Sequence, residues 1–156
     1  MNMPGTKQAL IVIADADGLI ALLSAEDANH QKAVATVEKL VQQDAQTIVP
    51  LSTILETVTT LKRKLGRTDL AEQVITQITG DSLTIEDVDR DMLNEALKVF
   101  DPKGSKQNTL FDAMVTATAK KHGTKVIFSM DAWYTKQGFT LAHQFVAKQE
   151  EKAQTS

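Results

Sequence analysis

The chain has 156 residues, of which 42% are hydrophobic and none is cysteine, and its formal net charge is −3. This length suits one domain with one apolar core, and the lack of cysteine excludes disulfides and thiolate metal sites, so a metal would be held by oxygen or histidine. The acidic balance excludes the overall basic excess that many nucleic-acid-binding proteins carry, so a nuclease function would have to come from a particular site.

Apolar runs and the start of the chain bear on domains and location. The runs at 9–14 and 18–23 are far shorter than the ~20 residues that cross a bilayer. Residues 1–7 lack the basic start, apolar stretch and cleavage site of a secretory signal. We therefore expect a cytoplasmic protein without a membrane span. Within it, we expect a disordered segment at 1–8, one domain at 9–147 and a frayed polar tail at 148–156.

The first half of the chain alternates short apolar runs with amphipathic helical patterns. Residues 9–14 (ALIVIA) are too short and too β-branched for a free helix, and therefore predict a buried strand. Gly66 is a natural stop for the helix before it. The expected elements are a strand at 9–14, helices at 19–23 and 26–43, a strand at 47–50, a helix from residue 52 or 53 to 65 and a helix at 68–79.

The second half continues this alternation. The expected elements are a strand at 83–85, a helix at 87–100, a loop at 101–105, a helix at 109–122, a strand at 125–128 and a short strand at 139–141. Strands separated by helices predict a parallel sheet that is covered on both faces, because parallel neighbours need crossover connections. The predicted class is α/β, a three-layer α/β/α fold with a central, mostly parallel sheet of four to five strands.

Four acidic residues stand where the expected strands end and helices begin. Asp15 follows the first strand and Glu56 lies near the start of the helix after the second. Asp112 opens the long helix, and Asp131 follows the strand at 125–128. Sites in parallel α/β sheets form at the carboxyl ends of the strands, so these carboxylates are expected to converge. Such a cluster is unfavourable without a cation.

Each acid also has a structural explanation. Thr53–Glu56 and Thr109–Asp112 both resemble capping boxes, in which a hydroxyl and an acid satisfy free backbone groups at a helix start. Asp131 could cap a short helix toward residue 136, and Asp15 with Asp17 could be turn acids. The joint pattern, rather than any single position, favours a site.

At these positions the sequence resembles the PIN-domain family. The resemblance runs in order from Leu10 to Leu141 and includes an aromatic residue three positions after the last acid. The matching motifs are Ile13–Leu23, Leu55–Val58, Thr109–Ala119 followed by Gly123, and Ser129–Tyr134.

The resemblance implies roles for particular residues. It makes Asp15, Glu56, Asp112 and Asp131 the catalytic, metal-binding acids. Hydroxyls at Thr109 and Ser129 match positions that commonly support the site. Asp17 departs from the pattern, because the family usually has serine, threonine or asparagine there. This acid either joins the metal site or turns the chain, and His30 matches a histidine for which a packing role is expected.

The resemblance also implies an activity and partners. Mg²⁺ or Mn²⁺ held by the acids would activate water for attack on RNA, so the expected protein is a metal-dependent endoribonuclease leaving a 5′-phosphate and a 3′-hydroxyl. Proteins of this length resemble the toxin half of VapBC-type toxin-antitoxin pairs, which implies a homodimer and a cognate antitoxin. The basic residues Lys62, Arg63, Lys64 and Arg67 could steer RNA phosphates toward the acids.

Two rival readings remain at this point. Asp15 to Leu19 (DADGL) is similar to the nucleophile motif of haloacid dehalogenase-type phosphatases, in which Asp15 would attack phosphate and Asp17 would act as acid and base. That reading leaves Glu56 and the Asp112 helix without a role. The other rival is a catalytically silent PIN-fold RNA-binding module, whose usual sign is the loss of one or more acids.

Overall fold

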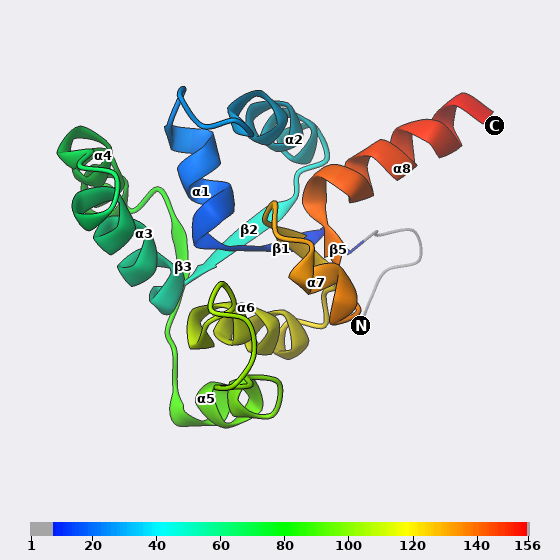
Figure 1. Cartoon of the computed structure of the whole chain (residues 1–156). Helices are drawn as coiled ribbons and strands as arrows, with labels where there is room; N and C mark the ends of the chain where they lie inside the picture. The colour runs from blue at the N-terminus through cyan, green and yellow to red at the C-terminus, as the bar shows by residue number, and fades with distance from the viewer. Residues whose placement is uncertain (1–7, 156) are drawn as a thin grey trace.

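A parallel sheet of five strands lies at the centre of the computed structural model, which describes residues 8–155 (Figure 1). The strands are β1 (Ile11–Ala14), β2 (Gln46–Pro50), β3 (Thr84–Glu86), β4 (Val126–Phe128) and β5 (Thr140–Leu141). Their spatial order is β3-β2-β1-β4-β5, and all four neighbouring pairs are parallel. The predicted α/β class and strand number are therefore confirmed.

The sheet grows outward in opposite directions from the neighbouring strands β1 and β4, which is a reversal of strand order. From β1 the chain adds β2 and β3 on one side, and then crosses to add β4 and β5 on the other. Ala14 is in register with Phe128, so the carboxyl ends of β1 and β4 lie side by side. A crevice at such a reversal is where ligands bind in open parallel sheets.

Eight helices of the described residues connect and cover the strands (Figure 1). They are α1 (Ala16–Leu23), α2 (His30–Gln42), α3 (Leu51–Arg63), α4 (Thr68–Thr79), α5 (Arg90–Leu97), α6 (Leu110–Lys121), α7 (Trp133–Lys136) and α8 (Ala142–Thr155). Successive strand residues point to opposite faces. Val12 and Ala14 therefore join the core that includes residues of α1, α2 and α8, whereas Ile13 joins the core with α6. The sheet is thus the middle of three layers.

The C-terminal helix α8 was not predicted. Residues 148–155, for which a frayed tail was expected, are the last turns of this helix. Its first turns bury Ala142 and Val146, and Lys39 of α2 pairs with Glu150 at 2.7 Å. The segment is also rich in the good helix formers alanine, lysine, glutamine and glutamate. Of the expected disordered segment 1–8, all but Gln8 lies outside the described residues, as does Ser156.

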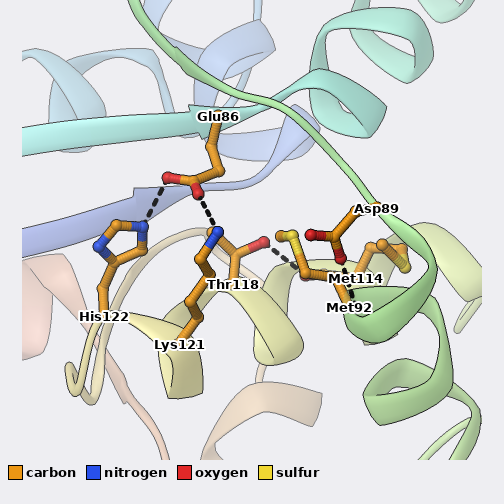
Figure 2. A network of polar contacts seen from close by, with 7 residues as sticks. All are labelled: Glu86, Asp89, Met92, Met114, Thr118, Lys121 and His122. Atoms are coloured by element: carbon orange, nitrogen blue, oxygen red, sulfur yellow. Dashed lines mark hydrogen bonds and ion pairs between the residues drawn. The ribbon is translucent and has the colours of Figure 1, made fainter.

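Helix α5 is shorter than the pattern at 87–100 predicted. Asp89 stops its extension toward the N-terminus, because its carboxylate caps the helix by accepting from the amide of Met92 at 2.9 Å (Figure 2). Just before it, Glu86 accepts from Nζ of Lys121 at 2.7 Å and lies 2.6 Å from Nε2 of His122 (Figure 2). These contacts fasten the edge strand β3 to the end of α6.

No helix within residues 8–155 has the length and hydropathy to cross a membrane.

Candidate active site

Asp15 stands at the point where the strand order reverses. Its amide donates to the carbonyl of Phe128 at 3.0 Å, which continues the pairing of β1 with β4. Its carboxylate then caps α1, because Oδ1 accepts from the amide of Ala16 at 2.7 Å. The side chain is buried, with 3% exposure. The sheet and the start of α1 therefore hold this carboxylate in a defined place.

Glu56 reaches the same region from α3. This helix begins at Leu51, directly after β2, so Thr53 lies inside it and donates through Oγ1 to the carbonyl of Ala14 at 3.1 Å. The capping-box explanation of Glu56 is therefore wrong, since the helix starts earlier than the pattern indicated. The buried Oε2 of Glu56 has no hydrogen-bond partner among residues 8–155.

Asp112 combines the capping and the site explanations. It lies in the first turn of α6, and its Oδ2 accepts from the amide of Thr109 at 2.8 Å. The capping alternative is therefore correct for this acid. Its other oxygen, Oδ1, lies 3.5 Å from the hydroxyl of Tyr134. Asp112 is 6% exposed, so its carboxylate is largely shielded from bulk water.

Tyr134 joins two of the acids and was missed as a site residue. Its hydroxyl donates to Oδ2 of Asp15 at 2.8 Å, and the side chain is fully buried. The sequence signal was present, because this is the aromatic residue that follows Asp131 by three positions. That match concerned the ring, and nothing in the sequence indicated that the hydroxyl would reach Asp15.

Asp131 lies at the rim of the cluster. Its Oδ1 accepts from the amide of Trp133 at 2.9 Å and its Oδ2 from the side-chain amide of Asn108 at 3.3 Å. The backbone amide of Asp131 donates to Oγ of Ser129 at 3.0 Å. It therefore shapes the start of α7, as the capping alternative proposed. Its charge also acts on Asp112, which raises the pKa of that carboxyl.

Asp17 connects α1 to the loop that carries Asp131. Its Oδ2 accepts from the amide of Met130 at 2.9 Å. Its Oδ1 is buried and, within the described part of the chain, has no hydrogen-bond partner. Asp17 is thus both a clamp on the β4–α7 loop and a further negative charge beside Asp15 and Asp112.

The cluster perturbs the proton affinity of its acids. Burial, followed by the charges of Asp17, Asp112 and Glu56, raises the pKa of Asp15 well above its usual range. Burial, helped by Asp112 and Asp17, raises the pKa of Glu56 to about 7. Burial is also the main reason that the pKa of Asp112 is raised. Carboxylates that repel each other in a desolvated place favour protons or a cation.

Unpaired polar atoms gather in the same place. Within residues 8–155, six buried side-chain atoms lack a hydrogen-bond partner, and four of these lie on α1, α3 and the start of α6: Asp17 Oδ1, Ser52 Oγ, Glu56 Oε2 and Thr109 Oγ1. In the present side-chain arrangement, no three acidic or histidine residues of the described chain are gathered to hold one metal ion. Oxygens of Asp15 and Asp112 accept the hydrogen bonds described above.

The basic residues near Glu56 are not equivalent. Lys62, Arg63 and Lys64 are exposed at the end of α3. Burial raises the pKa of Glu56, and the charge of Lys64 offsets a part of that rise. Arg67 is instead engaged by Asp69 at 2.9 Å and by Glu26 at 3.2 Å. His30 has the expected packing role, because its Nδ1 lies 2.8 Å from the carbonyl of Ala21 and joins α2 to α1.

Comparisons with known proteins agree with this geometry. A family model described as PIN domain matches residues 12–137. A protein named VapC ribonuclease, from Aquifex aeolicus, is 27% identical over 135 residues, which cover 85% of this chain and 96% of that protein. The crystal structure of VapC20 from Mycobacterium tuberculosis, described as a toxin that cleaves the sarcin-ricin loop, matches with a TM-score of 0.71 and 20% identity. This match covers 83% of this chain and 96% of that one, and it shows a shared fold.

Proposed function

Because this chain belongs to the PIN domain family, we propose that it is a metal-dependent endoribonuclease that hydrolyses RNA phosphodiester bonds at the acidic cluster. The observation that carries the proposal is the cluster itself. Buried or half-buried carboxylates of Asp15, Glu56 and Asp112 meet where the strand order reverses, and the pKa of each is raised, chiefly by burial. A fold keeps such an unfavourable group of charges where a ligand compensates it.

The residues of the cluster fit a divalent cation. All the available donors are hard carboxylate or hydroxyl oxygens, which Mg²⁺ and Mn²⁺ prefer. Glu56 and Asp17 each have a buried oxygen that nothing within the described residues satisfies. We propose that Asp15, Glu56, Asp112 and Asp131 hold Mg²⁺ or Mn²⁺. When bound, such a cation supplies Lewis acidity, which stabilises the negative charge that grows on the phosphodiester during attack.

The chain's own residues orient and confine the reaction. Asp15 is held by hydrogen bonds from the amide of Ala16 and the hydroxyl of Tyr134, and Asp112 is held by a hydrogen bond from the amide of Thr109. The buried side chains around them keep the interior side of the site dry, which strengthens every charge interaction there. Ser129 shapes the turn that carries Asp131. Thr109 holds Asp112 through its backbone amide rather than its hydroxyl, and a supporting role for the two hydroxyls at the cation site stays a proposal.

The exposed end of α3 offers a path for RNA. Lys62, Arg63 and Lys64 lie two turns beyond Glu56 on the same helix, and we propose that they attract RNA phosphates toward the acids. Arg67 is less suited to this role, because two carboxylates already engage its guanidinium. The proposed products are a 5′-phosphate and a 3′-hydroxyl.

We also propose that the protein is the toxin of a toxin-antitoxin pair and forms a homodimer in the cytoplasm. An apolar surface beside the acidic cluster supports a protein partner. Leu51 and Leu55 of α3, Leu93 of α5 and Phe111 of α6 are 37–58% exposed. Leu93 and Phe111 also line a cavity of about 640 Å³. Light scattering of the purified protein tests the dimer, and co-purification of the product of a neighbouring gene tests the antitoxin.

The two rival functions fare differently. The phosphatase reading is set aside, because the chain belongs to the PIN domain family and because Glu56 and Asp112 lie in the cluster that reading left without a role. A silent RNA-binding module would share the fold but not cut. A cleavage assay separates this reading from a nuclease.

The proposed activity is tested with purified protein and total RNA. We expect cleavage with Mg²⁺ or Mn²⁺, loss of cleavage with excess EDTA, and loss of cleavage in Asp112→Asn. Sequencing of the cut ends would identify the target and the chemistry of the termini. Cleavage that persists in EDTA, or in Asp112→Asn at the parent rate, would show that the acidic cluster is not the reaction centre.

A further inference from the structure

We propose that Tyr134 is a positioning residue whose buried hydroxyl holds Asp15 and Asp112 together as a preformed half of the cation site. This inference rests on the proposed function, because it assigns Tyr134 a role toward the cation that the acids would hold. Tyr134 itself lies on α7, whereas Asp15 ends β1 and Asp112 lies on α6. One hydroxyl therefore connects three elements that are distant in the sequence.

Burial leaves the hydroxyl few partners. Tyr134 has no exposed surface, and a buried hydroxyl without a hydrogen bond is costly. It donates to Oδ2 of Asp15 at 2.8 Å and lies 3.5 Å from Oδ1 of Asp112. The hydroxyl therefore satisfies its hydrogen bond at the carboxylate of Asp15.

The two acids on either side of Tyr134 are each held by a hydrogen bond from a backbone amide as well. Asp15 accepts from Ala16 at one oxygen and from Tyr134 at the other, so its carboxylate cannot turn without losing a bond. Asp112 is fixed at Oδ2 by the amide of Thr109, which directs its Oδ1 toward Tyr134. Glu56, in contrast, has an oxygen without a partner in residues 8–155. The Tyr134 pair is therefore held more firmly than Glu56.

The ring of Tyr134 is itself immobilised. It packs in the core on the α6 face of the sheet with Ile13, Ile127 and Phe139. Trp133 meets it edge to face, with ring centroids 5.2 Å apart. Because these contacts hold the ring, Tyr134→Phe should keep the packing and remove the hydroxyl alone. This makes the variant a direct test of the hydrogen bond.

A matched control removes another buried hydroxyl from the same layer. Thr118 is fully buried on α6, and its Oγ1 donates to the carbonyl of Met114 at 2.8 Å, on the side of α6 that faces α5 (Figure 2). Thr118→Val keeps the shape and loses one buried donor away from the acids. Comparison of the two variants separates the general effect of losing a hydroxyl from an effect on the site.

The experiment measures thermal melting of the parent, Tyr134→Phe and Thr118→Val across a Mn²⁺ titration, followed by RNA cleavage at the same metal concentrations. Loss of a group that supports a ligand typically weakens metal affinity or activity 10–100-fold. We expect Tyr134→Phe to need at least about ten times more Mn²⁺ for half of the melting shift, with cleavage displaced in parallel. Thr118→Val should keep the parent's Mn²⁺ response.

The outcomes separate this inference from the proposed function. If the parent shows neither a Mn²⁺ shift nor cleavage, the proposed function fails and the role of Tyr134 fails with it. If the parent responds and Tyr134→Phe responds at the same Mn²⁺ concentration, the function stands and the positioning role is overturned. Equal displacement in both variants would also overturn it, because the effect would then be one of general stability.

Discussion

Neutralising Glu56 should stabilise the metal-free protein above neutral pH. In the folded state burial, with the charges of Asp112 and Asp17, raises the pKa of Glu56 from its ordinary value of 4.5 to about 7. In the unfolded chain the same carboxyl ionises near the ordinary value. The fold therefore loses stability as pH rises from about 4.5 to about 7. Glu56→Gln has no proton to lose and stays neutral at every pH, so it should escape this penalty.

The size of the effect follows from the pKa. One pKa unit corresponds to about 1.4 kcal/mol. The rise from 4.5 to about 7 therefore means that full ionisation of Glu56 would cost the folded state about 3 kcal/mol before solvent screening is included. Glu56 is half-buried, and solvent screening reduces this to about 2 kcal/mol. For a chain of this length that corresponds to a melting temperature about 4–8 °C higher for Glu56→Gln at pH 8. At pH 5 the difference should fall to about a quarter of this value.

The assay is thermal melting in EDTA at pH 5 and pH 8, for the parent, Glu56→Gln and a control. Glu72→Gln is a suitable control, because it removes the same charge from an exposed position on α4. It should leave the melting temperature nearly unchanged at both pH values. A Glu56→Gln variant that melts at or below the parent temperature at pH 8, or that differs equally at both pH values, would refute the argument.

Three further predictions concern the surroundings of the site. Asp17→Asn keeps an oxygen for the amide of Met130 and should retain most of the cleavage activity, whereas Asp17→Ala should lower that activity about tenfold. If both variants lost activity equally, the negative charge of Asp17 would be essential. Gly18→Ala should reduce the free energy of unfolding by about 1–3 kcal/mol or more, because its Cβ would lie 2.4 Å from the carbonyl oxygen of Phe128. Thermal melting at a lower temperature would show this loss. Alanine at all three residues of 62–64 should raise KM about tenfold without changing kcat, whereas Arg67→Ala should leave KM unchanged; steady-state cleavage kinetics check both.

Strand and helix order were predictable because the patterns are strong. Buried parallel strands are continuous apolar runs, and the run at 11–14 is bounded by an acid that starts the next helix. The helix at 142–155 was missed for a related reason. Most of its residues are exposed and polar, so its apolar period is weak: Ala142 and Val146 are buried and Phe145 is partly buried against the core. Its formation depends on packing that the sequence does not display.

The gathering of Asp15, Glu56 and Asp112 was predictable, but the part of Tyr134 and the contacts within the cluster were not. Parallel strands place their carboxyl ends at one edge, so the positions of Asp15, Glu56 and Asp112 follow from strand and helix order. The hydroxyl of Tyr134 reaches Asp15 from 119 residues away. Such a contact depends on how α7 packs against the sheet, and no local sequence pattern predicts that packing. The same holds for Asp17, whose partner Met130 is 113 residues distant.

Capping by Asp112 is compatible with a further role of the same carboxylate in the acidic cluster. A carboxylate has two oxygens, and Asp112 uses Oδ2 for the amide of Thr109 while Oδ1 faces Tyr134. Asp15 divides its oxygens in the same way, between Ala16 and Tyr134. The bond to the helix start fixes the carboxylate and its negative charge is favourable there. The cap therefore holds the carboxylate while its second oxygen points into the cluster, so a capping motif at the carboxyl edge of a parallel sheet does not argue against a site.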